Sequence, residues 1–439
     1  MRILVIGPGA REHAIVRSLA GHELHAAPGN PGIGELATLH AVDPLDGAAV
    51  AALATELGAE LVVVGPEAPL VAGVADAVRA AGIACFGPSA EAAALEGSKS
   101  FAKEVMAAAG VPTAMAHVCT TVEQVADALD AFGAPHVVKD DGLAAGKGVV
   151  VTDDRTEALD HARGCLSRPG GTVVVEEFLD GPEVSLFCVS DGTTVVPLAP
   201  AQDFKRALDG DAGPNTGGMG AYSPLTWAPA DLVEEVLARV AQPTVDEMRH
   251  RGTPFVGVLY CGLALTSRGL RVIEFNARFG DPETQVVLAR LATPLSELLH
   301  AAAVGHLDTL APLRWHDEAA VTVVIAAHGY PAGVRAGDPI EGISEAEQAP
   351  GVHVLHAGTA AAADGSLVSA GGRVLSVVGV GADIAAARAA AYAGVERISL
   401  RGSHHRTDIA ARTPELDAPL DGLADDADPD PFGLRGGDD

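Results

Sequence analysis

The sequence predicts a multidomain protein that combines α/β and α+β architecture and begins with a Rossmann-like parallel sheet. Its 439 residues correspond to about three domains at roughly 150 residues each. Short apolar segments such as residues 61–64 alternate near the N-terminus with alanine-rich segments, which is typical of a parallel sheet covered by helices. Farther along, a glycine-rich loop with two lysines separates two apolar segments, which favours a small α+β unit.

The predicted N-terminal domain comprises residues 1–98. Strands are expected at residues 3–6 and 61–64, and a third ends near residue 86, each followed by a glycine-bearing turn. Ligands of such sheets bind beyond the carboxyl ends of the strands, so these turns are candidate ligand contacts. The turn at Gly7 matches a dinucleotide fingerprint only in part, because Glu12 stands where the third glycine belongs. A tight strand-to-helix turn explains it at least as well.

The predicted second domain comprises residues 99–318 and includes a small lid subdomain at about 120–186. A helix capped by Ser98 opens the domain. Asp281 as N-cap, with Pro282 at the first helical position, is expected to begin a late helix. The other elements expected in this domain are helices at 122–131, 156–166 and 230–250, and strands at 137–141, 149–151, 172–177, 256–265 and 271–275.

The predicted C-terminal domain comprises residues 319–412 and has α+β character. Strands are expected at 321–326, 352–356 and 373–380, followed by an alanine-rich helix at 383–397. In the last 25 residues, nine acidic side chains face only Arg435, and prolines and glycines are interspersed. The segment 413–439 is therefore predicted to be an acidic, disordered tail.

Charge and cysteine usage narrow the range of partners and compartments. A net charge of −29 argues against binding to nucleic acid or to an anionic membrane, because phosphate polymers are held through clustered basic side chains. Five dispersed cysteines show no zinc or disulfide spacing, which favours a reducing compartment. The first apolar run breaks at Gly7, too early for a signal peptide, and no later run approaches spanning length. We expect a cytoplasmic monomer.

The loop at residues 142–148 has the composition of a polyphosphate clamp. Glycines let backbone N–H groups approach phosphate oxygens, and Lys139 and Lys147 neutralise their charge. The loop is not a P-loop, because Gly148 follows Lys147 and no helix pattern begins there. The alternative is an ordinary hairpin with lysines on its surface.

Glu274 and Asn276 alternate with apolar residues, so a strand places both side chains on one face. Magnesium prefers carboxylate and carbonyl oxygens together with phosphate oxygens and water, so this pair suffices when ATP supplies the remaining ligands. The alternative is a pair of polar side chains that face solvent on an edge strand. Together with the clamp loop, the pair predicts an enzyme that holds a magnesium nucleotide between a lid and a sheet.

Two further segments fit a nucleotide site. The strand at 173–177 ends in carboxylates, and its backbone can pair with an adenine edge while Glu183 accepts from ribose hydroxyls. Plain charge at the edge of a sheet explains this segment about equally well. The polar loop at 202–220 is long for a compact domain, and such loops are usually functional or disordered.

Taken together, these motifs resemble the phosphoribosylamine-glycine ligase family of ATP-grasp enzymes, over Met1 to about Arg412. The motifs that carry the resemblance lie at 9–14, 28–32, 65–70, 139–149, 215–220, 274–283 and 371–375. The resemblance implies an ATP-grasp fold and ATP-dependent ligation of glycine to 5-phosphoribosylamine. The products would be glycinamide ribonucleotide, ADP and phosphate, formed through glycyl phosphate in de novo purine biosynthesis.

The resemblance also implies roles for individual residues. ATP would be bound by Lys99, Lys139, Gly146, Lys147, Glu176, Glu177, Phe178, Leu179, Glu183, Arg206 and Asn215. Substrates would be bound by Gly9, Arg11, Asn30, Glu67, Asp203, Gly217, Gly218, Met219 and Asp281. The metal ion, Mg²⁺ or Mn²⁺, would be bound by Glu274 and Asn276, and the catalytic set would be Lys139, Arg278 and Asp203.

The sequence departs from the family pattern at two positions. Phe204 stands where the family usually has histidine, and Asp140 follows Lys139 where alanine is usual. Strand alternation would point Asp140 away from the phosphates. Three other functions remain open: a different ATP-grasp carboxylate-amine ligase or carboxylase, a dinucleotide-dependent oxidoreductase built on the Gly7 turn, and a nucleotide sensor without turnover.

Overall fold

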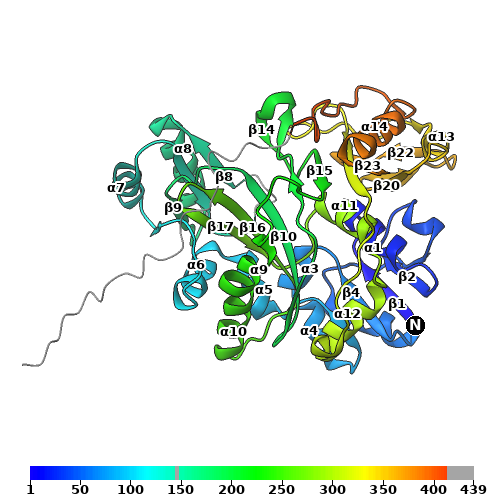
Figure 1. Cartoon of the computed structure of the whole chain (residues 1–439), viewed down its shortest axis with the longest axis horizontal. Helices are drawn as coiled ribbons and strands as arrows, with labels where there is room; N and C mark the ends of the chain where they lie inside the picture. The colour runs from blue at the N-terminus through cyan, green and yellow to red at the C-terminus, as the bar shows by residue number, and fades with distance from the viewer. Residues whose placement is uncertain (144–147, 413–439) are drawn as a thin grey trace, which may run out of the picture.

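The N-terminal part of the chain is a parallel sheet covered by helices. The structure is a computed structural model that describes residues 1–143 and 148–412 (Figure 1). The sheet has the order β3-β2-β1-β4-β5, with every neighbouring pair parallel, as predicted. Its strands are β1 Arg2–Ile6, β2 Glu23–Ala27, β3 Thr38–Leu39, β4 Leu61–Val64 and β5 Ala84–Phe86. Its helices are α1 Ala10–Ser18, α2 Gly47–Leu57, α3 Glu67–Val71, α4 Val74–Ala80 and α5 Ala90–Gly97.

The turn between β1 and α1 is built around Glu12. The Glu12 carboxylate accepts a hydrogen bond from the Gly9 backbone N–H at 2.6 Å, which satisfies a donor at the start of α1. Gly7 has φ +124°, and a Cβ there would lie 2.8 Å from the Glu12 side chain. The glycine is therefore required by backbone conformation and by close approach. Glu12 occupies the position of the third fingerprint glycine because it caps the helix.

The predicted lid subdomain, called the lid below, is a four-stranded antiparallel sheet with two helices. Its strand order is β6-β9-β7-β8, and apolar side chains such as Val125, Leu129 and Val138 form its core. The elements are β6 Ala116–Cys119, α7 Val122–Phe132, β7 His136–Asp140, β8 Val149–Thr152, α8 Arg155–Leu166 and β9 Val173–Glu176. The sheet thus begins before residue 120 and ends well before residue 186, the predicted limits. Residues beyond Pro182 pair instead with the central sheet.

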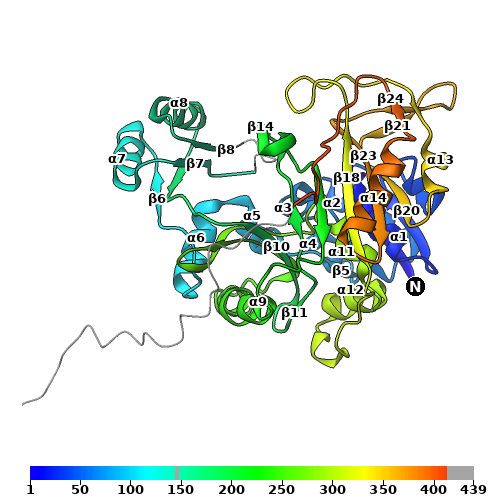
Figure 2. The same cartoon turned by 45° about the horizontal axis from the view of Figure 1, so that its top comes forward.

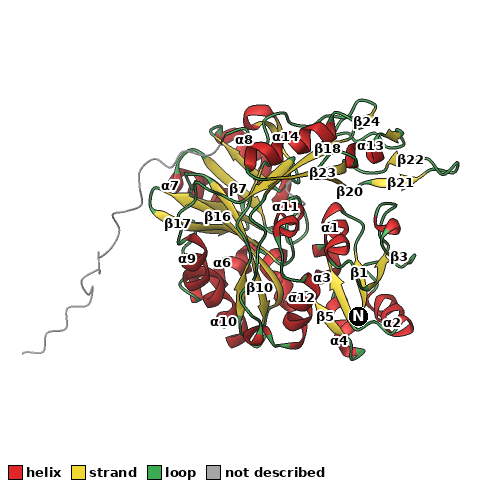
Figure 3. Ribbon diagram, turned by 45° about the vertical axis from the view of Figure 1, so that its right-hand side comes forward, coloured by secondary structure: helices red, strands yellow, loops and turns green. Residues whose placement is uncertain are grey.

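The central sheet carries the carboxylates and has the order β11-β10-β16-β17. Its strands are β10 Glu183–Asp191, β11 Val195–Pro197, β16 Val256–Thr266 and β17 Gly269–Asn276. Three helices lie together beside it, as Figure 3 shows: α6 Lys99–Ala108, α9 Leu232–Val236 and α10 Gln242–His250. The helix predicted at 230–250 is interrupted by a π-helical turn, Leu237–Ala241, just before Pro243. Because proline lacks the N–H that continues an α-helix, the hydrogen-bond ladder changes there.

The C-terminal sheet is shared between two predicted domains. Its order is β12-β15-β18-β23-β20, so the two strands from the second domain extend the C-terminal sheet. Its strands are β12 Gln202–Asp203, β15 Gly220–Ser223, β18 Ala319–Ala326, β20 Val352–His356 and β23 Arg373–Gly381. Helix α14, Ile384–Val395, packs on β23 and β18. This sharing fixes the loop between β12 and β15 against the C-terminal domain.

Short elements complete the described fold. Helix α11 Glu283–Arg290 packs on α1, β15 and β18, and α12 Leu295–Val304 packs on β5 and β10. Strands β13 Arg206–Leu208 and β14 Ala212–Asn215 form a hairpin. In the C-terminal part, α13 Ile343–Glu347 is accompanied by the pairs β19 Ile340–Glu341 with β24 Ser399–Leu400 and β21 Thr359–Ala361 with β22 Leu367–Ser369. All five cysteines are free and buried. Within the described residues, no helix combines the length and apolar character needed to cross a membrane.

The prediction that Asp281 caps α11 is wrong. The helix begins at Glu283, its N-cap position is Pro282, and no side chain caps it. The Asp281 carboxylate instead lies 3.2 Å from Arg373 Nη2 and accepts a hydrogen bond from Gln285 at 2.7 Å. A tertiary ion pair with β23 therefore takes the carboxylate that the local pattern assigned to the helix terminus.

Candidate active site

A buried carboxylate holds two lysines where the lid meets the central sheet. Glu176, at the end of β9, is 3 % exposed. Its two carboxylate oxygens lie 2.8 Å from Lys139 Nζ and 3.1 Å from Lys103 Nζ. Lys103 also donates to Thr113 Oγ1 and to the Ala114 carbonyl oxygen, each at 2.9 Å. Burial lowers the pKa of Lys103, although the Glu176 carboxylate acts in the opposite direction.

The start of the glycine loop is attached to α6. Lys99 Nζ donates to the Gly142 carbonyl oxygen at 3.0 Å, and the Asp141 carboxylate accepts from Ser98 Oγ at 3.1 Å and from the Ser100 backbone N–H at 3.2 Å. These contacts place Lys99 beside the loop. The predicted contacts Gly146 and Lys147 lie outside the described residues.

Asp140 points away from Lys139, as strand alternation predicts. Lys139 is turned toward Glu176 and β17, whereas the Asp140 carboxylate pairs with Arg168, in the segment that follows α8. Both side chains are buried. The departure from alanine at this position thus adds an ion pair on the opposite face of β7 and leaves the lysine face unchanged.

The cationic lid and the acidic sheet meet at the end of β17. Lys139 Nζ donates to the Ile273 carbonyl oxygen at 3.0 Å, one residue before Glu274. Glu274 and Asn276 follow each other on one face of the strand, opposite Gly262 and Tyr260 of β16, and both are half-buried. Burial tends to raise the pKa of Glu274, but the ammonium groups of Lys205 and Lys139 outweigh it and lower the pKa.

Next to Glu274 lies a second group of ionisable side chains, contributed by β12, β10, β16 and α11. Lys205 Nζ contacts the Glu183 carboxylate and lies 3.9 Å from Asp203 Oδ1. Glu283 is 3 % exposed and accepts from Ser185 Oγ at 3.0 Å, and Ser185 Oγ lies 2.8 Å from Tyr260 Oη. Burial raises the pKa of Asp203 to about 7, the Lys205 ammonium opposes this, and the nearby Glu283, Glu183 and Glu274 carboxylates reinforce it.

Arg278 connects this site with the N-terminal domain. Its guanidinium lies 3.2 Å from Glu67 Oε2, just after β4, and 2.9 Å from Glu96 Oε1 of α5. Burial works against the charge of Arg278, but the Glu96 and Glu67 carboxylates raise its pKa. Arg11 of α1 donates to the Phe279 carbonyl oxygen at 3.0 Å. The predicted residues Arg11, Glu67 and Arg278 therefore lie around one junction between the parallel sheet and β17.

The loop at Gly217 and Gly218 is held by an arginine of the C-terminal domain. Arg373 Nη1 donates to the carbonyl oxygens of Gly217 and, at 2.8 Å, of Asp281. Gly218 has φ +107°, and a Cβ there would lie 2.4 Å from Pro282 Cδ. Glycine is thus required for the close packing of the loop on the segment that precedes α11.

Two predicted substrate contacts are used within the protein itself. Asn30 Nδ2 donates to the carbonyl oxygens of Pro8 and His356, at 2.7 Å and 2.9 Å, and its Oδ1 accepts from Ile33. Met219 is fully buried, its backbone N–H donates to Phe204, and its carbonyl accepts from Val324. Both residues are thus engaged within the protein, and their contact with a substrate stays a prediction.

The predicted adenosine contacts lie along the chain between lid and central sheet. The Glu177 carboxylate accepts from the Met115 backbone N–H at 3.0 Å and lies 2.9 Å from Arg268. Phe178 is exposed and Leu179 half-buried, and neither backbone N–H donates to a group in the described part of the chain. Across from the lid stands the β13–β14 hairpin with Arg206 and Asn215, a placement on which Figures 1 and 2 agree.

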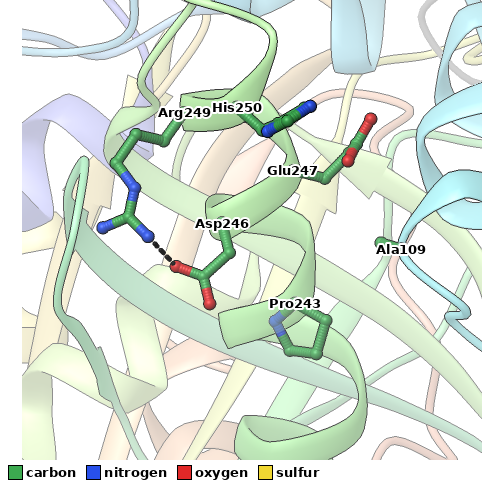
Figure 4. A pocket seen from close by; sticks show the side chains of 6 residues that line it. All are labelled: Ala109, Pro243, Asp246, Glu247, Arg249 and His250. Carbon is green, nitrogen blue, oxygen red and sulfur yellow. Dashed lines mark hydrogen bonds and ion pairs between the residues drawn. The ribbon is translucent and has the colours of Figure 1, made fainter.

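Two cavities of about 500 Å³ each lie outside this cluster. One is a groove along α10, where Figure 4 shows Asp246 paired with Arg249 at 2.8 Å. The other lies between α1 and α11 and includes Arg17, Gln285 and His353. Neither contains a predicted site residue, and the site described above is instead a cluster of charged side chains between domains.

The small number of lysines and their positions are a sequence signal that the motifs did not include. The chain has five lysines, and the four in the described residues all lie in this site, at 99, 103, 139 and 205. Lys103 and Lys205 could have been found in this way. Glu96 carries no such signal, because tertiary structure alone brings it to the site, and Glu283 and Arg373 stand in motifs that gave them no role.

The raised pKa of Asp203 gives a testable pH dependence of stability. The folded protein binds a proton at Asp203 up to about pH 7, whereas the unfolded chain releases it near pH 4. Between these values the folded state binds more protons, so the free energy of unfolding falls as pH rises, by about 1.4 kcal/mol per pH unit. Asp203→Asn has no titrating carboxyl group, so it removes this fall in the free energy of unfolding. Between pH 5 and pH 8, urea unfolding should show a free energy of unfolding that falls about 2–3 kcal/mol less for the variant than for the wild type.

An exposed carboxylate gives the matched control for this measurement. Asp364 accepts from Ser366 in a surface turn, and this contact lowers its pKa, so Asp364→Asn should follow the wild type between pH 5 and pH 8. A parallel pH dependence of wild type and Asp203→Asn would contradict the environment described for Asp203.

Comparisons with known proteins agree with this architecture. Three family models match consecutive parts of the chain: the phosphoribosylglycinamide synthetase N domain at 1–96, its ATP-grasp (A) domain at 97–284 and its C domain at 320–412. The phosphoribosylamine–glycine ligase of Streptomyces coelicolor is 70 % identical over 418 residues, which cover 94 % of this chain and 99 % of the relative. The enzyme of the same name from Mycobacterium tuberculosis is 57 % identical, with coverage of 94 % and 99 %.

Solved structures give the same result. The crystal structure of phosphoribosylamine–glycine ligase from Thermotoga maritima has a TM-score of 0.80 at 33 % identity and covers 93 % of this chain and 100 % of its own. A biotin carboxylase domain from Hydrogenobacter thermophilus, at 18 % identity and a TM-score of 0.69, shares the fold; it covers 92 % of this chain and 91 % of its own. The chain has the multidomain ATP-grasp fold, and it belongs to the phosphoribosylamine–glycine ligase family.

Proposed function

We propose that the protein ligates glycine to 5-phosphoribosylamine with ATP, giving glycinamide ribonucleotide, ADP and phosphate, in de novo purine biosynthesis. Family membership supports the reaction. The observation that carries the site assignment is the hydrogen bond from Lys139 to the Ile273 carbonyl, since it brings the cationic lid beside Glu274. A single triphosphate placed there would touch both.

The lysines are proposed to hold the phosphates. Lys99, Lys139 and Lys103 lie on one side of the site, and Lys139 and Lys103 share the buried Glu176 carboxylate. Glu176 thereby fixes the two ammonium groups before the nucleotide arrives, so little reorganisation is needed on binding. Lys147 and Gly146 would complete the lid side.

The adenosine is proposed to lie along the segment between lid and central sheet. The N–H groups of Phe178 and Leu179 donate to no group in the described residues, so an adenine edge could accept from them. The exposed Glu183 contacts Lys205 through Oε2, and its Oε1 would accept from the ribose hydroxyls. Glu177 holds this segment to Met115 and Arg268. Arg206 and Asn215 would approach from the opposite hairpin.

Glu274 and Asn276 are proposed to bind Mg²⁺ or Mn²⁺. The two oxygen donors share one face of β17, and hard oxygen ligands of this kind suit either ion. An ion bound by this pair would take its other ligands from phosphates and water. When bound, the ion would neutralise charge on the transferring phosphoryl group.

The amino acid and the sugar amine are proposed to meet between Arg278 and the N-terminal turns. Arg278 and Asp203 would bind glycine, and Gly9, Arg11, Glu67, Gly217, Gly218 and Asp281 would line the sugar phosphate site. The glycine carboxylate attacks the γ-phosphate and ADP leaves, giving glycyl phosphate. The amine of phosphoribosylamine then attacks the acyl carbon and phosphate leaves. Positioning and charge neutralisation suffice, so no enzyme nucleophile is required.

The function is tested by substrate dependence of ADP release. Purified protein with magnesium ATP should release ADP rapidly only when glycine and freshly generated phosphoribosylamine are both present. Replacing glycine with bicarbonate or alanine should reduce the rate to background. Equal rates with another carboxylate, or with glycine omitted, would contradict the proposal and favour a different ATP-grasp ligase or carboxylase.

We further propose that the protein works as a cytoplasmic monomer without nucleic-acid or membrane partners. The net charge of −29 supports the absence of a polyanionic partner. Light scattering at micromolar concentration, with and without MgADP, is expected to give the mass of one chain, and a mass of two chains would overturn the monomer.

A further inference from the structure

We propose that the segment Arg406 to Ile409 of the C-terminal domain is a clamp that positions the β13–β14 hairpin over the bound nucleotide. Arg406 is then a positioning residue for nucleotide binding. The proposal rests on the proposed function only in placing Arg206 and Asn215 at the nucleotide. Figures 1 and 2 both show the orange-red end of the described chain beside the hairpin that carries β14.

Arg406 is a buried arginine whose partners come from two parts of the molecule. It is 1 % exposed. Its Nε and Nη2 donate to the two carboxylate oxygens of Asp408, each at 2.7 Å, and its Nη1 donates to Asp211 Oδ1 at 2.7 Å and to the Arg206 carbonyl at 3.2 Å. A planar guanidinium can make such a bidentate contact and a second one together, whereas an ammonium group cannot.

Neighbouring residues tighten the same junction. The Thr407 backbone N–H donates to Asp209 Oδ1 at 2.8 Å, and Asp408 Oδ2 accepts from the Gly210 N–H at 2.8 Å. Asp209 and Gly210 form the tip of the hairpin, and Asp211 there has φ +53°, which non-glycine residues rarely adopt. The clamp therefore holds the tip from outside through several hydrogen bonds, in addition to the pairing within the hairpin.

The clamp is anchored behind by α14. Tyr392 Oη donates to the Arg406 carbonyl at 2.7 Å and accepts from the Ile409 N–H at 3.1 Å, and Arg388 Nε donates to the Ile409 carbonyl at 2.9 Å. Helix α14 packs on the C-terminal sheet. The hairpin is therefore tied through the clamp to a rigid layer of the structure.

Phe204 connects the clamp with the candidate active site. The Arg406 guanidinium lies over the Phe204 ring at 5.0 Å from its centroid. Phe204 separates Asp203 from Lys205, two ionisable residues beside Glu183. A buried cation over an aromatic face is stabilising, which gives a reason for phenylalanine at this position, where an imidazole would introduce a titratable group beside the cation. Displacing Arg406 would release both the hairpin and the strand that carries Asp203.

The test compares two C-terminal arginines. Arg406→Lys keeps the charge but loses the bidentate contact and the planar face. Arg401→Lys is the matched control, because Arg401 also contacts one aspartate with two nitrogens, Asp338 at 3.0 Å and 2.8 Å, but does not touch the hairpin. Isothermal titration calorimetry measures the Kd for MgADP, and thermal unfolding is recorded in parallel. We expect the Kd to rise about tenfold or more for Arg406→Lys and to change less than twofold for Arg401→Lys.

A second variant keeps the test decisive if Arg406→Lys does not fold. Asp209 is exposed, and Asp209→Asn weakens the two contacts with Thr407 without leaving a buried charge. It should raise the Kd for MgADP about threefold or more. A lower unfolding temperature with a Kd within twofold of the wild type, in every variant that folds, would overturn the clamp. Because MgADP binding needs no glycine, a failed glycine assay would end the proposed reaction without being mistaken for failure of the clamp.

Discussion

Replacing Glu274 by alanine is expected to lower kcat/KM for ATP by about a thousandfold while the protein remains folded. The reason is that Glu274 is the only carboxylate of the proposed metal pair, and charge stabilisation by a bound ion contributes several kcal/mol to phosphoryl transfer. Glu274 lies at the end of β17, half-buried, and the ammonium groups of Lys205 and Lys139 lower its pKa. Its removal therefore leaves no unpaired buried carboxylate.

The measurement is steady-state ADP release at several magnesium concentrations, with circular dichroism as the folding check. Arg271→Ala serves as the control on the same strand, since within the described residues the Arg271 side chain donates one hydrogen bond, to the carbonyl of its neighbour Leu270. The control should retain activity within about threefold. Full activity of Glu274→Ala at saturating magnesium would contradict the metal assignment.

Replacing Lys139 by methionine is expected to lower kcat/KM for ATP by about a hundredfold and also to destabilise the fold. Activity falls because a preorganised cation at the phosphates is lost. Stability falls because Glu176, 3 % exposed, keeps only the Lys103 contact at 3.1 Å. A buried carboxylate that loses one of two cationic partners should reduce the free energy of unfolding by about 1–3 kcal/mol.

A double variant tests whether Lys139 acts at the nucleotide or only neutralises Glu176. Glu176→Gln in the Lys139→Met background removes the carboxylate but leaves the buried Lys103 ammonium with only Thr113 and Ala114, so the free energy of unfolding should stay below that of the wild type. Activity should not return, because the missing phosphate cation is not replaced. Recovery of activity in the double variant would mean that Lys139 serves only to neutralise Glu176, and its proposed role at the nucleotide would be wrong. Urea unfolding and ADP release measure the two quantities on the same samples.

Much of the fold could be predicted because the strands are short, apolar and bounded by turns. The strands at 61–64 and 352–356 have the predicted limits, and the helix capped by Ser98 begins where the capping residue indicates. Long-range pairing could not be predicted. Strands β12 and β15 are too short for a hydrophobic pattern, and their place in the C-terminal sheet depends on β18.

The site residues could be predicted only where they stand in short sequence motifs. Lys139, Glu274 and Arg278 stand in motifs, and the structure brings them to one region. By contrast, the helix-cap rule assigned Asp281 to α11, and Arg373, 92 residues away, binds its carboxylate. Arg406 is the extreme case, because a cation 195 residues beyond Asp211 fixes the hairpin tip. Contacts of this kind depend on sheet order and domain packing, which no local pattern records.

The central claim is that lid and sheet meet around one nucleotide, and the most direct test is a crystal structure with magnesium and a non-hydrolysable ATP analogue. The account predicts Lys139 Nζ at hydrogen-bond distance, about 2.7–3.2 Å, from a phosphate oxygen. It also predicts the Glu274 carboxylate at about 2.0–2.1 Å from the magnesium ion that touches the same triphosphate. Phosphates bound away from either Lys139 or Glu274 would contradict it.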